Sequence, residues 1–141
     1  MKGLLAAVLA PYVALAQAPP VTWTGTYACA QGTTAVALTV QPTGTANRAD
    51  ALFHFKADPA IPGVAEGCFA MSGTFDARHL RLQATDWILH PADYVTVDVV
   101  ADVGPDGQSA QGVVKGPGCT ILLLRRAKRD PGEARCHRPT S

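Results

Sequence analysis

Apolar and polar residues alternate with a period of two along most of the chain, most clearly over residues 23–29. The odd positions of that segment are Trp, Gly, Tyr and Cys, whereas the even positions are Thr, Thr and Ala. A two-residue period with β-branched and aromatic residues is typical of a strand that turns one face to a core and the other to water. We find no convincing 3.6-residue period, so the pattern predicts an all-β protein.

The same alternation recurs in further short segments, which are separated by turns rich in Gly, Pro, Asn and Asp. The predicted strands are residues 23–29, 34–40, 51–56, 68–75, 79–84, 94–101, 109–115 and 119–124. Local turns between consecutive strands indicate a meander, and closing the sheet would remove both exposed edges. We therefore expect an eight-stranded antiparallel up-and-down barrel. An immunoglobulin-like sandwich is the main alternative, but it would place a Trp where residues 38–42 have none.

The sequence also predicts an export signal before this barrel and a basic tail after it. Residues 1–18 combine a basic start, an apolar run and a small-residue cleavage site ending at Ala18. These features are those of a secretory signal peptide, too short to span a membrane as a helix. We therefore expect a periplasmic or secreted protein with a barrel domain over residues 19–127 and a basic C-terminal tail over residues 128–141.

Four cysteines, Cys29, Cys68, Cys119 and Cys136, follow the predicted cleavage site. An even count in an exported chain favours two disulfides, and four cysteines allow three pairings. In a closed meander the end of the first strand lies beside the start of the last, which favours Cys29–Cys119. Cys68 would then pair with Cys136 and tie the tail to the barrel. A Cys68–Cys119 bond remains the rival pairing.

The distribution of charge and the absence of certain motifs limit the classes of partner and ligand that we expect. Without Lys2 the basic and acidic residues balance at eleven each, but residues 125–141 carry a net charge of +4. Such a tail is most often solvated, and its alternative role is contact with an anionic envelope surface. The sequence has no stripe of basic and aromatic residues of the kind that binds nucleic acid. Cys136-His137 has no second ligand pair for zinc, and residues 116–118 lack the context of a phosphate loop. We expect no metal and no cofactor.

The segment W-x-G-x-Y-x-C-x-Q-G at residues 23–32, with G-P-G-C-T at residues 116–120 and Arg125, resembles a group of small exported bacterial domains. We know of no activity assigned to that group, and Cys68 and Cys136 are additions to its pattern. The Trp-Gly opening and the meander are also similar to avidins and lipocalins. That second likeness concerns architecture alone, and it implies no biotin binding.

The meander places its links after odd-numbered strands at one mouth: residues 30–33, 57–67, 85–93 and 116–118. This mouth holds the predicted site residues, which are Gln31, Trp87, His90, Asp93 and Tyr94. Loops on a rigid scaffold concentrate binding groups, and barrel mouths commonly hold ligands. Trp87 and Tyr94 would form an aromatic platform with His90 and Asp93 as its polar partners. The competing interpretation makes Trp87 a plug over the barrel end and His90 part of a turn.

The sequence favours binding over catalysis. Asp86, Asp93 and Asp98 are candidates for a carboxylate pair, and His90 with Asp93 resembles half of a triad, but no serine lies in a nucleophile context. His54 is predicted to be a surface or packing residue. The leading hypothesis is an exported, non-enzymatic binding module, in its most specific form an inhibitor of an envelope or foreign hydrolase. Its partner would be a protein, a glycan or a small apolar ligand. The alternatives are a small-ligand or lipid carrier that uses the barrel interior and, third, a hydrolase.

Overall fold

A computed structural model describes residues 3, 7, 18–56, 60, 63–130 and 132–137 of the 141-residue chain. The signal peptide predicted for residues 1–18 falls almost entirely outside these described residues, as do residues 138–141 of the predicted tail. Within the described part, we find no helix with the length and apolar character needed to cross a bilayer.

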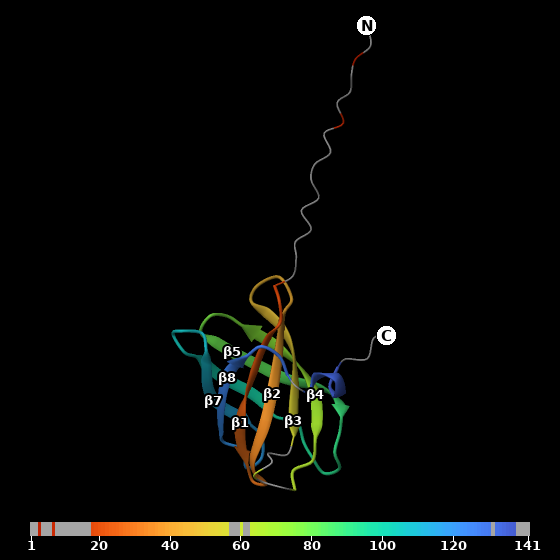
Figure 1. Ribbon diagram of the computed structural model, residues 1–141, viewed down its shortest axis with the longest axis vertical. Coiled ribbons are helices and arrows are strands. Elements are labelled where there is room, and N and C mark those ends of the chain that lie inside the picture. The colour runs from red at the N-terminus through yellow and green to blue at the C-terminus, as the bar shows by residue number, and fades with distance from the viewer. Residues whose placement is uncertain are drawn as a thin grey trace.

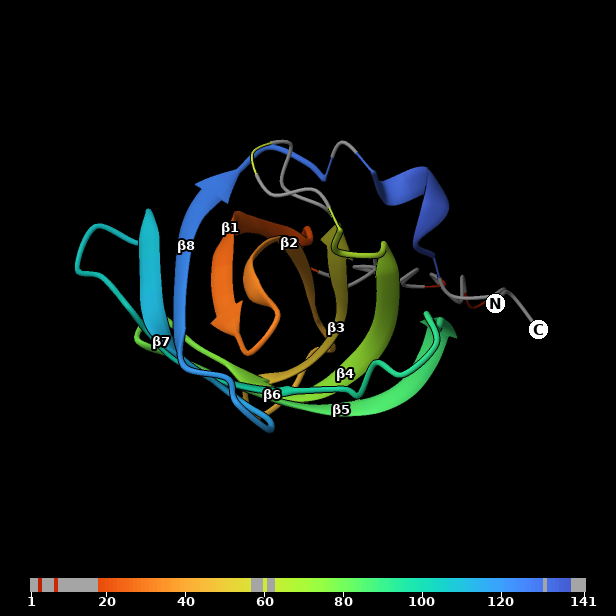
Figure 2. The same cartoon turned by 90° about the horizontal axis from the view of Figure 1, so that it is seen from below.

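The described chain forms one antiparallel sheet that closes on itself, with the strands in sequence order around the ring (Figures 1 and 2). The elements are β1 (Val21–Cys29), β2 (Gly32–Pro42), β3 (Arg48–Lys56), β4 (Gly67–Phe75), β5 (His79–Leu89), β6 (Asp98–Val103), β7 (Ser109–Lys115), β8 (Ile121–Ala127) and a short 3-10 helix, η1 (Glu133–Arg135). β1 pairs with β2 on one side and with β8 on the other, so the ring has no open edge there. The prediction of an eight-stranded up-and-down barrel is confirmed.

Large side chains fill the inside of the barrel. Phe53 and Phe69 lie nearly parallel with ring centroids 4.8 Å apart, and Tyr27 meets Phe53 edge-on at 5.3 Å. The other largest buried side chains on the inward faces are Trp23, Phe55, Leu38, Met71, Leu80, Leu82, Leu122, Val40 and Val99. The alternation in β1 therefore identified its inward face correctly. The interior is a packed core, as expected when side chains fill a barrel of eight strands.

Three inward-facing glycines lie where a neighbouring strand comes too close for any side chain. A Cβ atom on Gly25 of β1 would overlap the carbonyl oxygen of Leu123, and one on Gly112 of β7 would overlap that of Val100. Gly73 of β4 faces a neighbouring carbonyl group in the same way. Glycines at such positions let strands bend sharply and approach one another, which a small barrel needs in order to close.

β5 and β6 differ from their predicted bounds. β5 continues to Leu89 instead of ending at Ala84, and β6 begins at Asp98 instead of Tyr94, so the connection is residues 90–97. The cause is a pair of register irregularities between β4 and β5, which interrupt the two-residue alternation. The Asp98 carboxylate accepts a hydrogen bond from the Ala84 N–H at 2.9 Å, beyond the last paired residues of the β5–β6 ladder.

Both disulfides have the favoured pairing. Cys29 at the end of β1 is bonded to Cys119 just ahead of β8, across a sequence separation of 90 residues. Cys68 on β4 is bonded to Cys136 after η1, which excludes the rival Cys68–Cys119 bond. The first bond therefore seals the barrel where its first and last strands meet, and the second ties the tail to the wall.

We expect Gly25→Ala to lower the free energy of unfolding by at least about 2 kcal/mol, because the added methyl group would push β1 away from β8. The measurement is urea unfolding with the disulfides intact. The control is Thr24→Ala, at the preceding residue of β1, whose side chain points outward. It should change stability by less than about 1 kcal/mol. Equal effects of the two substitutions would show that the β1–β8 contact tolerates a side chain at Gly25.

Candidate functional site

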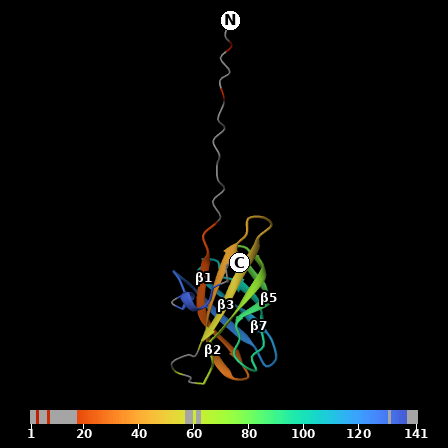
Figure 3. The same ribbon diagram turned by 90° about the vertical axis from the view of Figure 1, so that its right-hand side faces the viewer.

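The connections divide between the two ends of the barrel (Figures 1 and 3). The β2–β3 turn, residues 43–47, lies at the upper rim as drawn, and the β1–β2 turn, residues 30–31, lies at the lower rim. A cavity of about 280 Å³ opens at this lower rim. Its lining residues are Tyr27, Cys29, Gln31, Phe55, Asp93, Tyr94, Val95, Val97, Pro117 and Cys119. The mouth chosen from the sequence is therefore the end that carries this cavity.

Three of the five predicted site residues line the cavity, namely Gln31, Asp93 and Tyr94. Trp87 does not line it. Its half-buried ring packs edge-on against Phe69 and Phe55, with centroids 5.2 and 6.2 Å apart, so it acts largely as a packing residue.

His90 is also absent from the cavity lining, although it lies on the same connection. Its ring stacks on Trp87 with the centroids 4.1 Å apart, and its Nε2 lies 2.8 Å from the Tyr94 carbonyl oxygen. These contacts make His90 a brace of the connection and not a partner of Asp93. The Trp87–Tyr94 platform predicted from the sequence is thus replaced by two separate contacts with Phe55, one from each ring.

Asp93 is held at the cavity in an uncommon backbone conformation. It occupies the third position of a turn in which the Tyr94 N–H donates to the Pro91 carbonyl oxygen at 3.3 Å. Its φ is +66°, in the left-handed region that glycine adopts freely and that Asp and Asn tolerate better than other residues. Strained positions of this kind persist where the surroundings fix them, and they gather at binding sites. The turn therefore holds the backbone of Asp93 at the edge of the cavity, and its side chain is exposed there.

Aromatic rings form much of the remaining lining. Tyr94 stacks on Phe55 with the ring centroids 5.4 Å apart and the planes 9° from parallel. The Ala65 N–H donates to the Tyr94 hydroxyl oxygen at 3.2 Å, so the hydroxyl's own proton remains able to reach another acceptor. Tyr27 lies deeper, and burial is the main cause that raises its pKa above the usual value, with the nearby Tyr94 adding to the rise.

An exposed apolar edge borders these polar groups. Val95 is 62% exposed, more than any other large apolar residue in the described part of the chain. It lies next to Tyr94 in the 90–97 connection and lines the same cavity as Pro117. A pocket with aromatic walls, two polar side chains and an exposed apolar edge is suited to receive a group from another molecule.

A larger groove, of about 720 Å³, lies against β6, β7, β8 and β1. Its lining residues are Thr24, Gly25, Asp102, Val103, Gly104, Ser109, Ala110, Gln111, Leu123, Leu124 and Arg125. Here Asp102 is already engaged by the Arg81 guanidinium at 3.1 Å, and no aromatic residue lines the groove. The lower rim offers the more specific chemistry despite its smaller volume.

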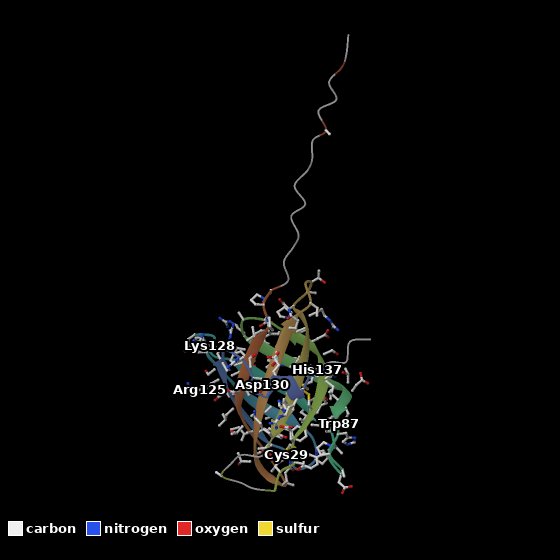
Figure 4. All side chains as sticks on the ribbon, turned by 45° about the vertical axis from the view of Figure 1, so that its right-hand side comes forward. Cys29, Trp87, Arg125, Lys128, Asp130 and His137 are labelled. Atoms are coloured by element: carbon white, nitrogen blue, oxygen red, sulfur yellow. A yellow bond between two sulfur atoms is a disulfide. The ribbon has the colours of Figure 1, made fainter. Side chains whose placement is uncertain are left out.

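The outer wall holds a buried charged cluster that sequence analysis did not identify. Ala37, His54 and Cys68 form one row across β2, β3 and β4, and all three are at most 2% exposed although they point outward. Residues 128–130 and 132–137, here called the strap, run outside the barrel from β8 toward β4 (Figure 2). Figure 4 shows Asp130 of the strap at mid-height on the wall, well above Cys29.

The strap is fixed to the wall by charge and by a covalent bond. His54 Nδ1 lies 2.7 Å from Asp130 Oδ2, with both side chains buried, and His54 Nε2 lies 3.5 Å from Glu66 Oε2. Lys56 Nζ lies 3.7 Å from the other Asp130 oxygen. The packing prediction for His54 is confirmed by its burial, but its carboxylate partners came from segments that no local pattern connects.

Two of the residues considered for catalysis, Asp98 and His90, have partners in the structure. Asp98 is engaged with a backbone N–H of β5, and His90 with the carbonyl group of Tyr94. In the described part of the chain, no three His, Cys, Asp or Glu side chains gather as a metal-binding group. The lower rim holds a cavity with a mixed aromatic and polar lining.

The fold and this rim define a disulfide-bonded, closed eight-stranded β-barrel with an aromatic-lined cavity at its lower rim. No family model, curated protein sequence or solved structure matches the chain. The resemblance to small exported bacterial domains, and the looser one to avidins and lipocalins, therefore stay predictions.

We expect Asp130→Asn to speed tryptic cleavage after Lys128 and Arg129 at least about tenfold, because it removes the charge that faces buried His54. Mass spectrometry after reduction follows the cleaved bonds. Arg135→Gln is the control, since its bond to Glu66 is largely exposed and should contribute less than about 1 kcal/mol. Wild-type cleavage rates in Asp130→Asn would show that the ion pair does not hold the strap.

We expect the free energy of unfolding to fall less steeply above about pH 10 in Tyr27→Phe than in the wild type. Since the pKa of Tyr27 is raised in the folded state, its contribution is fully present below the unfolded pKa of 10.0 and is lost as the pH rises toward the folded value. Urea unfolding followed by tryptophan fluorescence measures the difference. Parallel pH profiles would contradict the buried placement of the Tyr27 hydroxyl.

Proposed function

We propose that the protein is an exported, non-enzymatic binding module that receives a projecting group of a partner protein in the cavity at its lower rim. The observation that carries this proposal is the cavity itself, which combines Tyr27, Phe55 and Tyr94 with the polar side chains of Gln31 and Asp93. Its volume of about 280 Å³ lies at the lower end of the range for whole small-molecule ligands. Such a space suits one side chain better than a whole cofactor.

The surroundings of the cavity favour a protein partner. Val95 gives the rim an exposed apolar contact beside Tyr94, and tyrosine is one of the residues that most often carry the energy of a protein interface. The rim rests on a rigid base, because the Cys29–Cys119 bond lies directly in the cavity wall. A pre-organised rim loses little conformational entropy on binding, which favours affinity.

The packed interior weighs against the carrier alternative. Stacked Phe53 and Phe69, together with Tyr27, occupy the space that a lipid or other apolar ligand would need. The disulfides are consistent with an oxidising, extracellular or periplasmic environment. Small disulfide-bonded scaffolds with one binding end are suited to blocking the active sites of larger proteins. An envelope or foreign hydrolase is therefore the partner class that we propose first.

The proposal is tested by placing a photo-crosslinking residue at Val95 and, as a control, at Val113, an exposed valine on the wall at β7. We expect position 95, and not position 113, to crosslink to a defined protein in the extracellular or periplasmic fraction. With that protein purified, Val95→Asp should weaken binding at least about tenfold, because a charge would replace an apolar contact at the rim.

Val113→Asp should leave the affinity for the same protein unchanged, which separates loss of the rim contact from a general effect of added charge. Equal affinities of wild type and Val95→Asp, or crosslinks that come only from position 113, would overturn the proposal. Inhibition of the captured protein's activity, if it is a hydrolase, would identify the module as an inhibitor.

A further inference from the structure

We propose that the lower-rim cavity recognises a cation at the end of an aliphatic stem, namely the ammonium group of a lysine or the guanidinium group of an arginine. This inference rests on the proposed function and specifies which side chain of the partner enters. Its basis is the exposed carboxylate of Asp93, which lies beside the ring of Tyr94 and an apolar wall in a space of about 280 Å³.

The charge in the cavity has one sign. Asp93 is the charged member of the described lining, and no basic side chain lines the cavity to neutralise it. No hydrogen bond or ion pair of the described structure engages its carboxylate, and the left-handed turn keeps Asp93 in place through the backbone. A carboxylate that is held open in this way provides a ready partner for a cation, and hydrogen bonds that involve charged groups are stronger than neutral ones.

The aromatic residues strengthen the same preference. Phe55 and Tyr94 stack on each other with their planes 9° from parallel, and Tyr27 is buried, so Tyr94 is the least buried of the three aromatic residues in the lining. The negative face of an aromatic ring attracts an ammonium or guanidinium group within about 6 Å of its centroid. An anionic group would meet both the Asp93 carboxylate and these ring faces unfavourably. The apolar side chains of Val95 and Val97 fit the methylene stem that carries the charge.

The remaining polar groups match the donors of such a cation. Gln31 lines the cavity and carries a side-chain oxygen that can accept a hydrogen bond, and the Tyr94 hydroxyl oxygen, which accepts from the Ala65 N–H, has a second lone pair. Both lysine and arginine carry several N–H donors and no acceptor, so each of these oxygens offers a possible partner.

The distribution of charge over the chain agrees with this preference. Residues 19–124 carry a net charge of −4, whereas the basic residues gather from Arg125 onward. Figure 4 shows Arg125 and Lys128 higher on the wall than Cys29, which lines the cavity. The cavity thus opens away from Arg125 and Lys128, whereas Lys56 and Lys115, at the ends of β3 and β7, lie at its end of the barrel without lining it.

The test uses ¹H–¹⁵N NMR titration of the intact protein with three probes: N-acetyl-lysine amide, N-acetyl-arginine amide and the neutral isostere N-acetyl-norleucine amide. We expect at least one cationic probe to shift the signals of Gln31, Asp93 and Tyr94 in a saturable manner. Norleucine amide should bind at least about fivefold more weakly, because it has the stem and lacks the charge.

Asp93→Asn should reduce the affinity for the cationic probe about fivefold to tenfold, while leaving norleucine amide unaffected. Asn tolerates the left-handed conformation, so this variant should fold normally, and its spectrum away from the rim provides the check. Asp86→Asn removes the same charge from an exposed residue that does not line the cavity. It should retain wild-type affinity.

Equal affinity for norleucine amide, equal losses in Asp93→Asn and Asp86→Asn, or no saturable shift with either cationic probe would each overturn the cation preference. None of these results would contradict the proposed function if a partner protein crosslinks at position 95 and binds Val95→Asp more weakly. A failure of the inference is therefore distinguishable from a failure of the proposed function.

Discussion

The contact between the first and last strands is the constraint on which the rest of the molecule depends. β1 pairs with β8 over six residues, and Cys29 is bonded to Cys119 at the lower end of that seam. The seam works because Gly25 allows β8 to come close, where any side chain would meet the backbone of Leu123. Closing a loop of about ninety residues stabilises the fold by roughly 4–5 kcal/mol on the chain-entropy model.

The cavity at the lower rim is a consequence of this closure. Cys29 and Cys119 join the wall of the barrel directly beneath the lower rim, and both line the cavity. The 90–97 connection forms another part of the cavity wall. It can cross the rim because β6 is short and begins only at Asp98. Tyr94 from that connection stacks on Phe55 of the core. The candidate site is thus an extension of the hydrophobic core into loops, and the turn at Asp93 is anchored to the core through Tyr94.

The strap and the lower rim have separate supports. The strap is held on the outer wall by the His54–Asp130 pair and by the Cys68–Cys136 bond, whereas the cavity relies on the seam and on the aromatic core. A buried hydrogen-bonded pair is costly to break from one side, since the remaining polar group would be left without a partner in a place that water does not reach. The pair therefore specifies where the strap lies more than it adds to overall stability.

Local pattern determined the strands, their inward faces and the closure. The period of two at Trp23, Gly25 and Tyr27 is a property of any half-buried strand, and short turns permit little besides a meander. The tertiary structure alone decided how the rim is assembled. The register between β4 and β5 shifts at two places, and Trp87, on the extended part of β5, packs against Phe69. An alternating pattern of residues carries no signal for such a shift. Likewise, the partners of His54 come from residues far away in sequence, because burial and charge pairing are settled only when distant segments pack together.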